Sequence, residues 1–152
     1  MQRLPWDPTP VGEMTDLGTL PGMPSSGAYA LNDRDQVVGI ASAGAGEDWV
    51  ARAFVWERGQ LKALDALPGF GKSFAYDINE RGQIVGYMSG PPNAYLQAVV
   101  WQQGVATTLP ALPGGTSTWA MAINTRGEIV GVSDDRPVIW RRGVPTSTCG
   151  VK

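Results

Sequence analysis

Short apolar runs separated by polar turns recur along the chain. The runs before each turn read AYALN, AYDIN and AMAIN, and those after it read QVVGIA, QIVGYM and EIVGVS. Side chains in the first group alternate between two faces, which is typical of a β-strand. No segment carries an apolar period of 3.6 residues over the length of a helix. The pattern therefore predicts an all-β protein.

The first predicted strand of each set has a small residue at a fixed place on one face and a larger one on the other. The small residues are Ala28, Ala75 and Ala120. The larger residues are Tyr29, Tyr76 and Met121. Repeated alanine predicts that a neighbouring backbone approaches this face closely. The Val-Val and Ile-Val pairs of the second strand predict that both faces of the sheet are covered.

Three landmarks recur in the same order and at nearly equal intervals, which is the signature of a repeat architecture. The asparagines that open a turn are Asn32, Asn79 and Asn124. The LPG triplets begin at Leu20, Leu67 and Leu112. The tryptophans that end an apolar run are Trp56, Trp101 and Trp140. We expect the asparagine amides to bond the turn backbone and the tryptophans to anchor the core between sheets.

Each repeat is predicted to form four short strands within a single domain, 1–152. The units are 17–63, 64–108 and 109–143, and residues 144–152 form a tail. Gly82 and Gly127 stand where the first turn needs a positive φ, and Asp35 takes their place in the first copy. Residues 1–16 look like the end of a further unit, in which Trp6 matches the tryptophans above. An N-terminal strand would then join the last sheet and close a ring.

Three four-stranded units fit more than one β-architecture. We favour propeller blades. Propellers normally contain about four to eight blades, so three blades would complete a ring by pairing two chains. A β-trefoil also has three four-stranded units in a chain of about this length, and it is the alternative. A β-prism or an open stack is the third option. The blade interpretation leads us to expect a homo-oligomer.

The segment TDLGTLPGMPSSGAYALNDRDQVVG, together with ARAFVW and their copies, resembles the HAF-repeat family, named for a His-Ala-Phe triplet ahead of a tryptophan. The resemblance covers roughly residues 15–143. It implies extracellular repeat proteins with a propeller-like arrangement. Here the triplet reads Arg52-Ala53-Phe54, then Gln97-Ala98-Val99, then Arg136-Pro137-Val138. Any role of the family's histidine is therefore not carried over to this chain.

The net charge and the hydropathy of the chain exclude some classes of binding partner. The net charge is −2, which gives no long-range attraction to phosphate backbones, so we expect no nucleic-acid partner. No run of 18 apolar residues occurs, so we expect no membrane insertion. The N-terminus lacks the charged and apolar regions of a signal peptide. The compartment stays open, with the family resemblance pointing to an extracellular one.

Histidine and cysteine, which many catalytic and metal sites use, are absent or rare in this chain. The chain has no histidine and one cysteine, Cys149. This composition excludes a Ser-His-Asp triad and the usual Cys/His zinc sites, so we expect no metal and no cofactor. Paired carboxylates of the kind that hydrolyse glycosides are Glu47 with Asp48 and Asp134 with Asp135. Adjacent acidic residues in a polar loop are far more often solvated surface charges, so we do not expect an enzyme.

Four aromatic residues are the candidate ligand-binding residues. Trp49 and Tyr95 occupy nearly matching places in the first two variable loops, and loops on a rigid sheet are where binding residues collect. Phe74 and Trp119 match each other in the repeat and would extend such a surface or cap the core. Aromatic rings beside polar groups suit stacking on a sugar or a peptide side chain.

These observations favour a non-catalytic binding or interaction module that presents variable loops to a glycan or protein ligand. A purely structural, self-assembling repeat is the alternative. A carbohydrate-active enzyme that uses loop carboxylates is the weakest of the three.

Overall fold

The computed structural model describes residues 12–90 and 95–147, which form twelve β-strands and one 3₁₀ turn, η1 (Gly46–Asp48). The first sheet contains β1 (Ser25–Leu31), β2 (Val37–Ala43), β3 (Val50–Glu57) and β4 (Gln60–Ala63). The second contains β5 (Lys72–Ile78), β6 (Ile84–Ser89), β7 (Leu96–Gln102) and β8 (Val105–Thr108). The third contains β9 (Thr118–Ile123), β10 (Ile129–Ser133), β11 (Arg136–Arg141) and β12 (Val144–Ser147). The prediction of an all-β protein is confirmed.

Each sheet is an antiparallel meander in which the strands lie in chain order. Three tandem four-stranded units were predicted, and this prediction is confirmed. The trefoil alternative is wrong, because a trefoil joins strands of different units in one barrel. Among the described residues, every sheet is built from a single unit, and the three sheets do not close on one another.

The expected tail at 144–152 is wrong in its first four residues. Val144–Ser147 forms β12, which pairs with β11 and completes the third sheet. The third unit therefore continues beyond position 143. Trp6 and most of the segment expected to complete a unit lie outside the described residues, as does Cys149.

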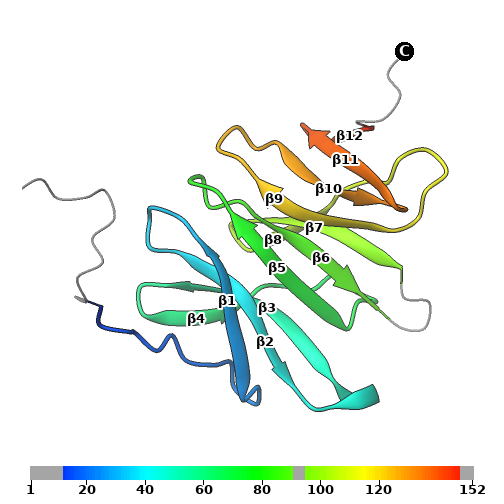
Figure 1. The fold of residues 1–152 in the computed structure, drawn as a ribbon. Coiled ribbons are helices and arrows are strands. Elements are labelled where there is room, and N and C mark those ends of the chain that lie inside the picture. The colour runs from blue at the N-terminus through cyan, green and yellow to red at the C-terminus, as the bar shows by residue number, and fades with distance from the viewer. Residues whose placement is uncertain (1–11, 91–94, 148–152) are drawn as a thin grey trace, which may run out of the picture.

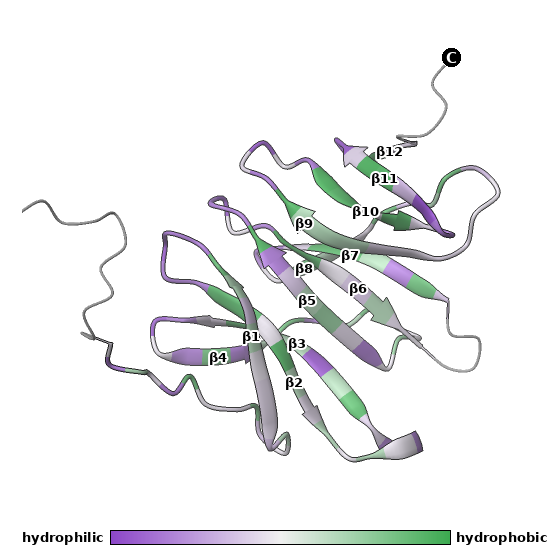
Figure 2. Cartoon of the chain, viewed as in Figure 1, coloured by the Kyte–Doolittle hydropathy of each residue, from purple (hydrophilic) through white to green (hydrophobic). Residues whose placement is uncertain are grey.

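The sheets stack one after another, each led by its first strand (Figure 1). Strand β5 lies against β1, β2 and β3, and β9 lies against β5, β6 and β7. A core between the first two sheets includes Val38, Met88 and Trp101, and a core between the last two includes Val85 and Trp140. Apolar residues follow the strands, whereas hydrophilic ones gather at the turns (Figure 2). No helical segment in the described part of the chain is long and apolar enough to cross a bilayer.

The position of a sheet in the stack decides how deeply its repeated residues are buried. Ala75 and Ala120 are fully buried between sheets, as the repeated alanine predicted. Ala28 is exposed, because no sheet precedes the first one in the part of the chain that the structure describes. The same gradient separates Trp101, which is fully buried, from Trp56, which is half-buried at the outer face of the first sheet.

The buried tryptophans anchor each sheet to the loop that enters it. The indole nitrogen Nε1 of Trp101 donates a hydrogen bond to the carbonyl oxygen of Asp65 at 2.8 Å. That of Trp140 donates to the carbonyl oxygen of Pro110 at 2.8 Å. Burial of a large ring with its one polar atom satisfied is strongly stabilising. The expectation of a tryptophan core is confirmed for these two units.

A glycine repeats in the second strand because the first strand passes directly over it. A Cβ atom on Gly86 would overlap the carbonyl oxygen of Phe74, and one on Gly39 would overlap that of Gly27. The overlap would be with backbone, so a change of rotamer could not relieve it. The glycine after each Val-Val or Ile-Val pair therefore records the close pairing of the first two strands.

The asparagines tie each turn together and also tie one unit to the next. The side-chain oxygen of Asn79 accepts hydrogen bonds from the backbone N–H groups of Arg81 and Gln83 at 3.1 and 3.0 Å. Its amide nitrogen Nδ2 donates to the carbonyl oxygen of Asn124 at 3.0 Å. Asn32 makes the same bonds in its own turn and donates to the carbonyl oxygen of Asn79 at 3.0 Å. The expected turn bonds are confirmed, and the bonds between units form a ladder.

Candidate functional site

A β-bulge in the first strand of every sheet turns one side chain out of the regular alternation. Ala28 pairs with Gly39 and Ala30 pairs with Val38, so Tyr29 is the extra residue of the first bulge. Tyr76 and Met121 are the extra residues of the other two. Bulges re-aim side chains and are common next to binding sites. Here they bring the three matching positions to one side of the stack.

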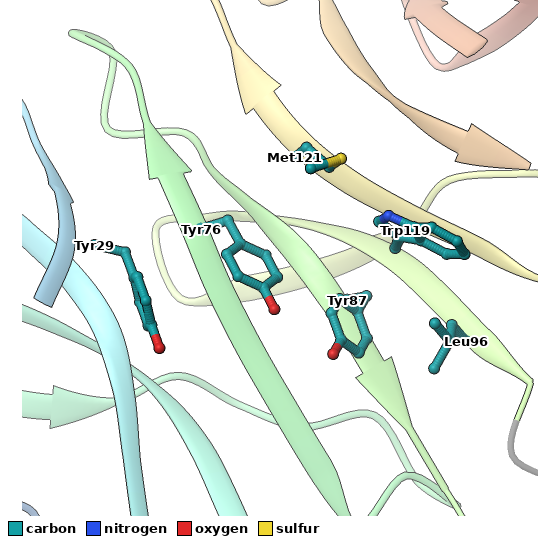
Figure 3. A pocket seen from close by; sticks show the side chains of 6 residues that line it. All are labelled: Tyr29, Tyr76, Tyr87, Leu96, Trp119 and Met121. Atoms are coloured by element: carbon teal, nitrogen blue, oxygen red, sulfur yellow. The ribbon is translucent and has the colours of Figure 1, made fainter. Parts of the chain in front are cut away.

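These bulge residues line a cavity of about 480 Å³. Its walls come from five strands in all three sheets: Tyr29, Tyr76, Tyr87, Leu96, Trp119 and Met121. Figure 3 shows the three tyrosine rings side by side, with their hydroxyl groups pointing the same way. Trp119 and Leu96 lie at the other end of the cavity from Tyr29.

The tyrosines belong to a continuous row of aromatic rings. The rings of Tyr29 and Tyr76 have centroids 5.7 Å apart, and Tyr76 stacks on Tyr87 at 5.7 Å with an interplanar angle of 24°. Tyr87 stacks on Phe74 at 4.5 Å and 21°, and Phe74 lies 6.0 Å from Trp49. Such packing holds each ring in place, because every ring has aromatic neighbours at a favourable distance.

A second cavity, of about 370 Å³, adjoins the first and shares Tyr29 and Tyr76 with it. It lies over Gly27, the counterpart of Phe74 and Trp119 in the first repeat. A Cβ atom at Gly27 would meet nothing within 4 Å. The first sheet therefore leaves open the space that an aromatic side chain occupies in the other two. The remaining lining residues are Ser25, Ser26, Ile40, Ser42, Trp49 and Phe74.

The structure brings three of the four predicted site residues to these cavities and leaves one apart. Trp49 and Phe74 lie together at the second cavity, and Trp119 lines the first. Phe74 is only 8% exposed, so its ring mainly supports Tyr87. Tyr95 is half exposed, lies edge-on to Phe70 at 6.2 Å and lines neither cavity.

The sequence interpretation did not include Tyr29, Tyr76 and Tyr87 among the site residues. A signal for the first two was present, because they share the face opposite the repeated alanine. The bulge that brings these side chains together could not be predicted from the sequence, because it depends on the register between two strands. Tyr87 reaches the site because it lies directly opposite Phe74 across the β5–β6 pair.

The described residues that line both cavities are all uncharged. Burial raises the pKa of the Tyr87 phenol well above its usual value, and the adjacent Tyr76 raises it further. The Tyr87 hydroxyl therefore stays neutral over the physiological pH range and can both donate and accept hydrogen bonds. A cation lies beside one end of the aromatic row: the Nζ atom of Lys72 is 5.1 Å from the centroid of the Trp49 ring.

The candidate carboxylates stand apart from the cavities. Asp134 accepts hydrogen bonds from the backbone N–H groups of Thr116 and Ser117, and these bonds lower the pKa of its carboxyl group. Asp134 and Asp135 form the β10–β11 turn with φ of 43° and 66°. Glu47 and Asp48 lie in η1. Across residues 12–90 and 95–147, no group of three or more Cys, Asp or Glu side chains is placed to hold a metal ion.

Comparison of the chain with protein-family models, with curated protein sequences and with solved structures finds no match. The HAF-repeat resemblance stays a prediction.

Proposed function

We propose that the protein is a non-catalytic binding module whose two adjoining aromatic cavities take a carbohydrate. The observation that carries this proposal is the row of rings from Trp49 to Tyr29, held on rigid strands and edged by tyrosine hydroxyl groups. The cavity volumes, about 480 and 370 Å³, lie in the range of small-molecule sites.

The chemistry of the lining suits a sugar. A pyranose ring has flat C–H faces that stack on aromatic rings, and hydroxyl groups at its edge that exchange hydrogen bonds with other hydroxyl groups. Tyr29, Tyr76 and Tyr87 supply both kinds of contact from one side chain each. The absence of charge among the lining residues favours a neutral ligand, because a buried charge without a partner is costly.

The arrangement of carboxylates supports binding without catalysis. Glycoside hydrolysis ordinarily requires two carboxyl groups that flank the scissile bond. Among the described residues, no carboxylate lines either aromatic cavity. Glu47 lines a separate hollow beside Trp49, and the other described residues of that hollow include no carboxylate. Asp134 is held by backbone amides at a turn.

A glycan array, followed by titration calorimetry on the best binder, tests the proposal. Tyr76→Leu removes a central ring, and Gly27→Phe fills the second cavity with the side chain found in the second repeat. We expect each to weaken binding by about tenfold or more, a change of about 1.4 kcal/mol. Tyr76→Phe keeps the ring and should weaken binding less. Tyr95→Leu is the matched control, because Tyr95 is an exposed aromatic residue outside both cavities.

All variants are first checked for an unchanged thermal melt. The proposal is wrong if the array shows no glycan binding, or if folded Tyr76→Leu and Gly27→Phe bind as the wild type does. A parallel peptide array distinguishes the ligand class. Binding only to peptides, lost in the same two variants, would keep the site and replace the carbohydrate.

A further inference from the structure

The contacts between neighbouring units are built alike, and they leave a different face open at each end of the stack. We call the face of a sheet that meets the preceding unit its leading face, and the face that meets the following unit its trailing face. Each internal contact therefore joins the trailing face of one sheet to the leading face of the next. Within residues 12–90 and 95–147, no sheet lies against the leading face of the first sheet or against the trailing face of the third. Both open faces carry the residue positions that the internal contacts bury.

The leading face of the first sheet exposes apolar side chains. Leu31 is 71% exposed, whereas its counterpart Ile78 is 5% exposed against the first sheet. Trp56 is half-buried where Trp101 is fully buried. Leu31, Val37 and Trp56 line a hollow of about 490 Å³ together with polar and charged residues, which are Arg34, Asp35, Gln36, Glu57 and Arg58. In the second unit the corresponding surface is covered by the preceding sheet.

The trailing face of the third sheet is open in the complementary way. Val130 is 45% exposed, whereas its counterparts Val38 and Val85 are fully buried against the following sheet. Asn124 is exposed, whereas Asn32 and Asn79 are buried. The residues that would meet a following sheet are therefore present and uncovered.

The asparagine ladder also has two complementary ends. Asn32 donates to the carbonyl oxygen of Asn79, and Asn79 donates to that of Asn124. The Nδ2 atom of Asn124 donates to the Glu128 side chain, and within the described chain it reaches no asparagine carbonyl. No preceding asparagine amide donates to the carbonyl of Asn32 in the same part of the chain. One end thus offers a donor and the other an acceptor.

We propose that a second copy of this chain continues the stack head to tail. The trailing face of the third sheet of one copy packs on the leading face of the first sheet of the other. Val130 enters the hollow lined by Leu31 and Trp56 of the partner subunit, as Val38 packs in the core that holds Ile78 and Trp101. Asn124 Nδ2 donates to the carbonyl oxygen of the partner's Asn32, which extends the ladder by one step.

Charged groups at the turns fit the same arrangement. Between the first two units, the Glu80 carboxylate accepts a hydrogen bond from the Asp33 backbone N–H, and Arg34 Nη1 approaches the Glu80 carbonyl oxygen at 3.4 Å. The counterpart of Glu80 at the start of the stack is Asp33, and the counterpart of Arg34 at its end is Arg126. By the same geometry, the proposed contact places the Arg126 guanidinium opposite the main-chain carbonyl oxygen of the partner's Asp33, and the carboxylate of that residue opposite the backbone N–H of Thr125.

One internal hydrogen bond is not repeated in the proposed contact. Ala53 N donates to Ser73 Oγ at 2.9 Å, and Ala98 N donates to Thr118 Oγ1 at 2.8 Å. In the third unit the position equivalent to these donors is Pro137, which has no N–H. In the first unit the position equivalent to these acceptors is Ser26, whose hydroxyl group donates to the Gly18 carbonyl oxygen. The outer contact is therefore weaker than the internal ones, and we expect association to depend on concentration.

Head-to-tail contacts form a ring if the rotation closes and a filament if it does not. Two copies would supply six four-stranded sheets, which lies within the usual range for propellers. The contact is independent of the carbohydrate proposal, because Leu31, Val130 and Asn124 line neither aromatic cavity.

Light scattering over a range of protein concentrations tests the contact. The mass of the wild type should rise to twice the chain mass of 16.2 kDa if the contacts close a two-chain ring, and beyond it if they continue as a filament. Leu31→Glu and Val130→Glu each block one face, and each should remain at the single-chain mass. An equimolar mixture of the two should regain the double mass, because one intact face of each kind remains. Val105→Glu is the matched control, since Val105 is an exposed valine of the second sheet, away from both faces.

A wild type that stays at the single-chain mass at every concentration overturns the proposal. So does a mixture that stays single-chain while both variants melt like Val105→Glu. If Leu31→Glu has the single-chain mass while Val130→Glu keeps the mass of the wild type, two leading faces pair with each other and the head-to-tail arrangement is wrong. Should either glutamate variant fail to fold, Leu31→Ser and Val130→Ser repeat the same comparison.

Discussion

Asn32 donates a hydrogen bond from its side-chain amide to the main-chain carbonyl of Asn79, 47 residues later in the chain. The same side chain organises its own turn through two bonds to backbone N–H groups. One residue type thus provides both the local turn and the contact between repeats. This double role accounts for the asparagine of the first two units, and the turn bonds account for the asparagine of the third.

The ladder predicts an unequal cost for removing two matching asparagines. Asn79→Ala loses the turn bonds and the partly buried bond to Asn124, so the free energy of unfolding should fall by about 2–3 kcal/mol. Asn124→Ala is the matched control, since it loses turn bonds of the same kind at an exposed position. Its cost should be about 1 kcal/mol. Urea denaturation of both variants measures the difference, and equal losses would show that the ladder bond adds nothing.

The difference in burial between the matching tryptophans predicts that replacing them with alanine costs different amounts of stability. Trp101→Ala should destabilise the fold by about 3–5 kcal/mol, because the ring is fully buried and its indole N–H is bonded to Asp65. Trp56→Ala removes the same atoms from a half-buried site and should cost less than half as much. Thermal and urea unfolding compare the two. A melt unchanged by Trp101→Ala would contradict the core assignment.

The repeated glycine predicts a steric penalty that depends on strand pairing alone. Gly86→Ala places a methyl group against the Phe74 carbonyl oxygen, so we expect a loss of about 1–3 kcal/mol as the strands move apart. Gly27→Ala, in open space on the first strand of the first sheet, should change stability by less than about 0.5 kcal/mol. Equal effects in urea unfolding would mean that the β5–β6 pairing is wrong.

The Glu128 carboxylate, in the turn between β9 and β10, leads us to expect that the protein loses stability in acid. The Arg141 guanidinium, helped by the Asn124 amide, lowers the pKa of Glu128 from 4.5 to about 2. A group whose pKa is lower in the folded state stabilises the fold above its unfolded pKa. That contribution is lost as the pH falls from about 4.5 towards about 2.

The thermal midpoint of the wild type should therefore fall between pH 5 and pH 2.5, and Glu128→Gln should show a smaller fall. Asp134, whose pKa is also lowered, acts in the same direction, so the variant should retain part of the acid effect. Glu57→Gln serves as a control, because the Glu57 carboxylate has no guanidinium partner: it lies 3.8 Å from the Lys62 ammonium and accepts a hydrogen bond from the Gln36 amide among the described residues. Identical acid profiles for wild type and Glu128→Gln would contradict the assigned partners.

Much of the fold could be predicted because its signals are local. Alternating apolar residues, the asparagine turns and the residues with positive φ, such as Asp35 and Gly82, depend on a few neighbouring positions. Each is repeated, and three copies of one pattern confirm one another. The strand assignment extended even to the third repeat, where only the end of the last unit was placed too early.

The candidate site was predictable only in part, for a geometric reason. Trp49, Phe74 and Trp119 could be chosen because they are large aromatic residues in or near variable segments. Tyr95 satisfied the same criterion and lies elsewhere, since residue type does not determine the direction of a side chain. Tyr29 and Tyr76 reach the cavity through bulges, which arise from the pairing of two strands.

By itself, then, the sequence determined the number of units, their four-stranded pattern and the chemistry of their turns, because these follow from short-range periodicity and backbone preference. The tertiary structure alone decided which copies of each repeated residue are buried, which rings meet across the sheets and which two faces stay open. Those properties depend on what lies beside each sheet, and three nearly identical units can have three different neighbourhoods. Ala28 is exposed whereas its counterparts Ala75 and Ala120 are fully buried, and the reason is the neighbouring sheet that only the latter two have.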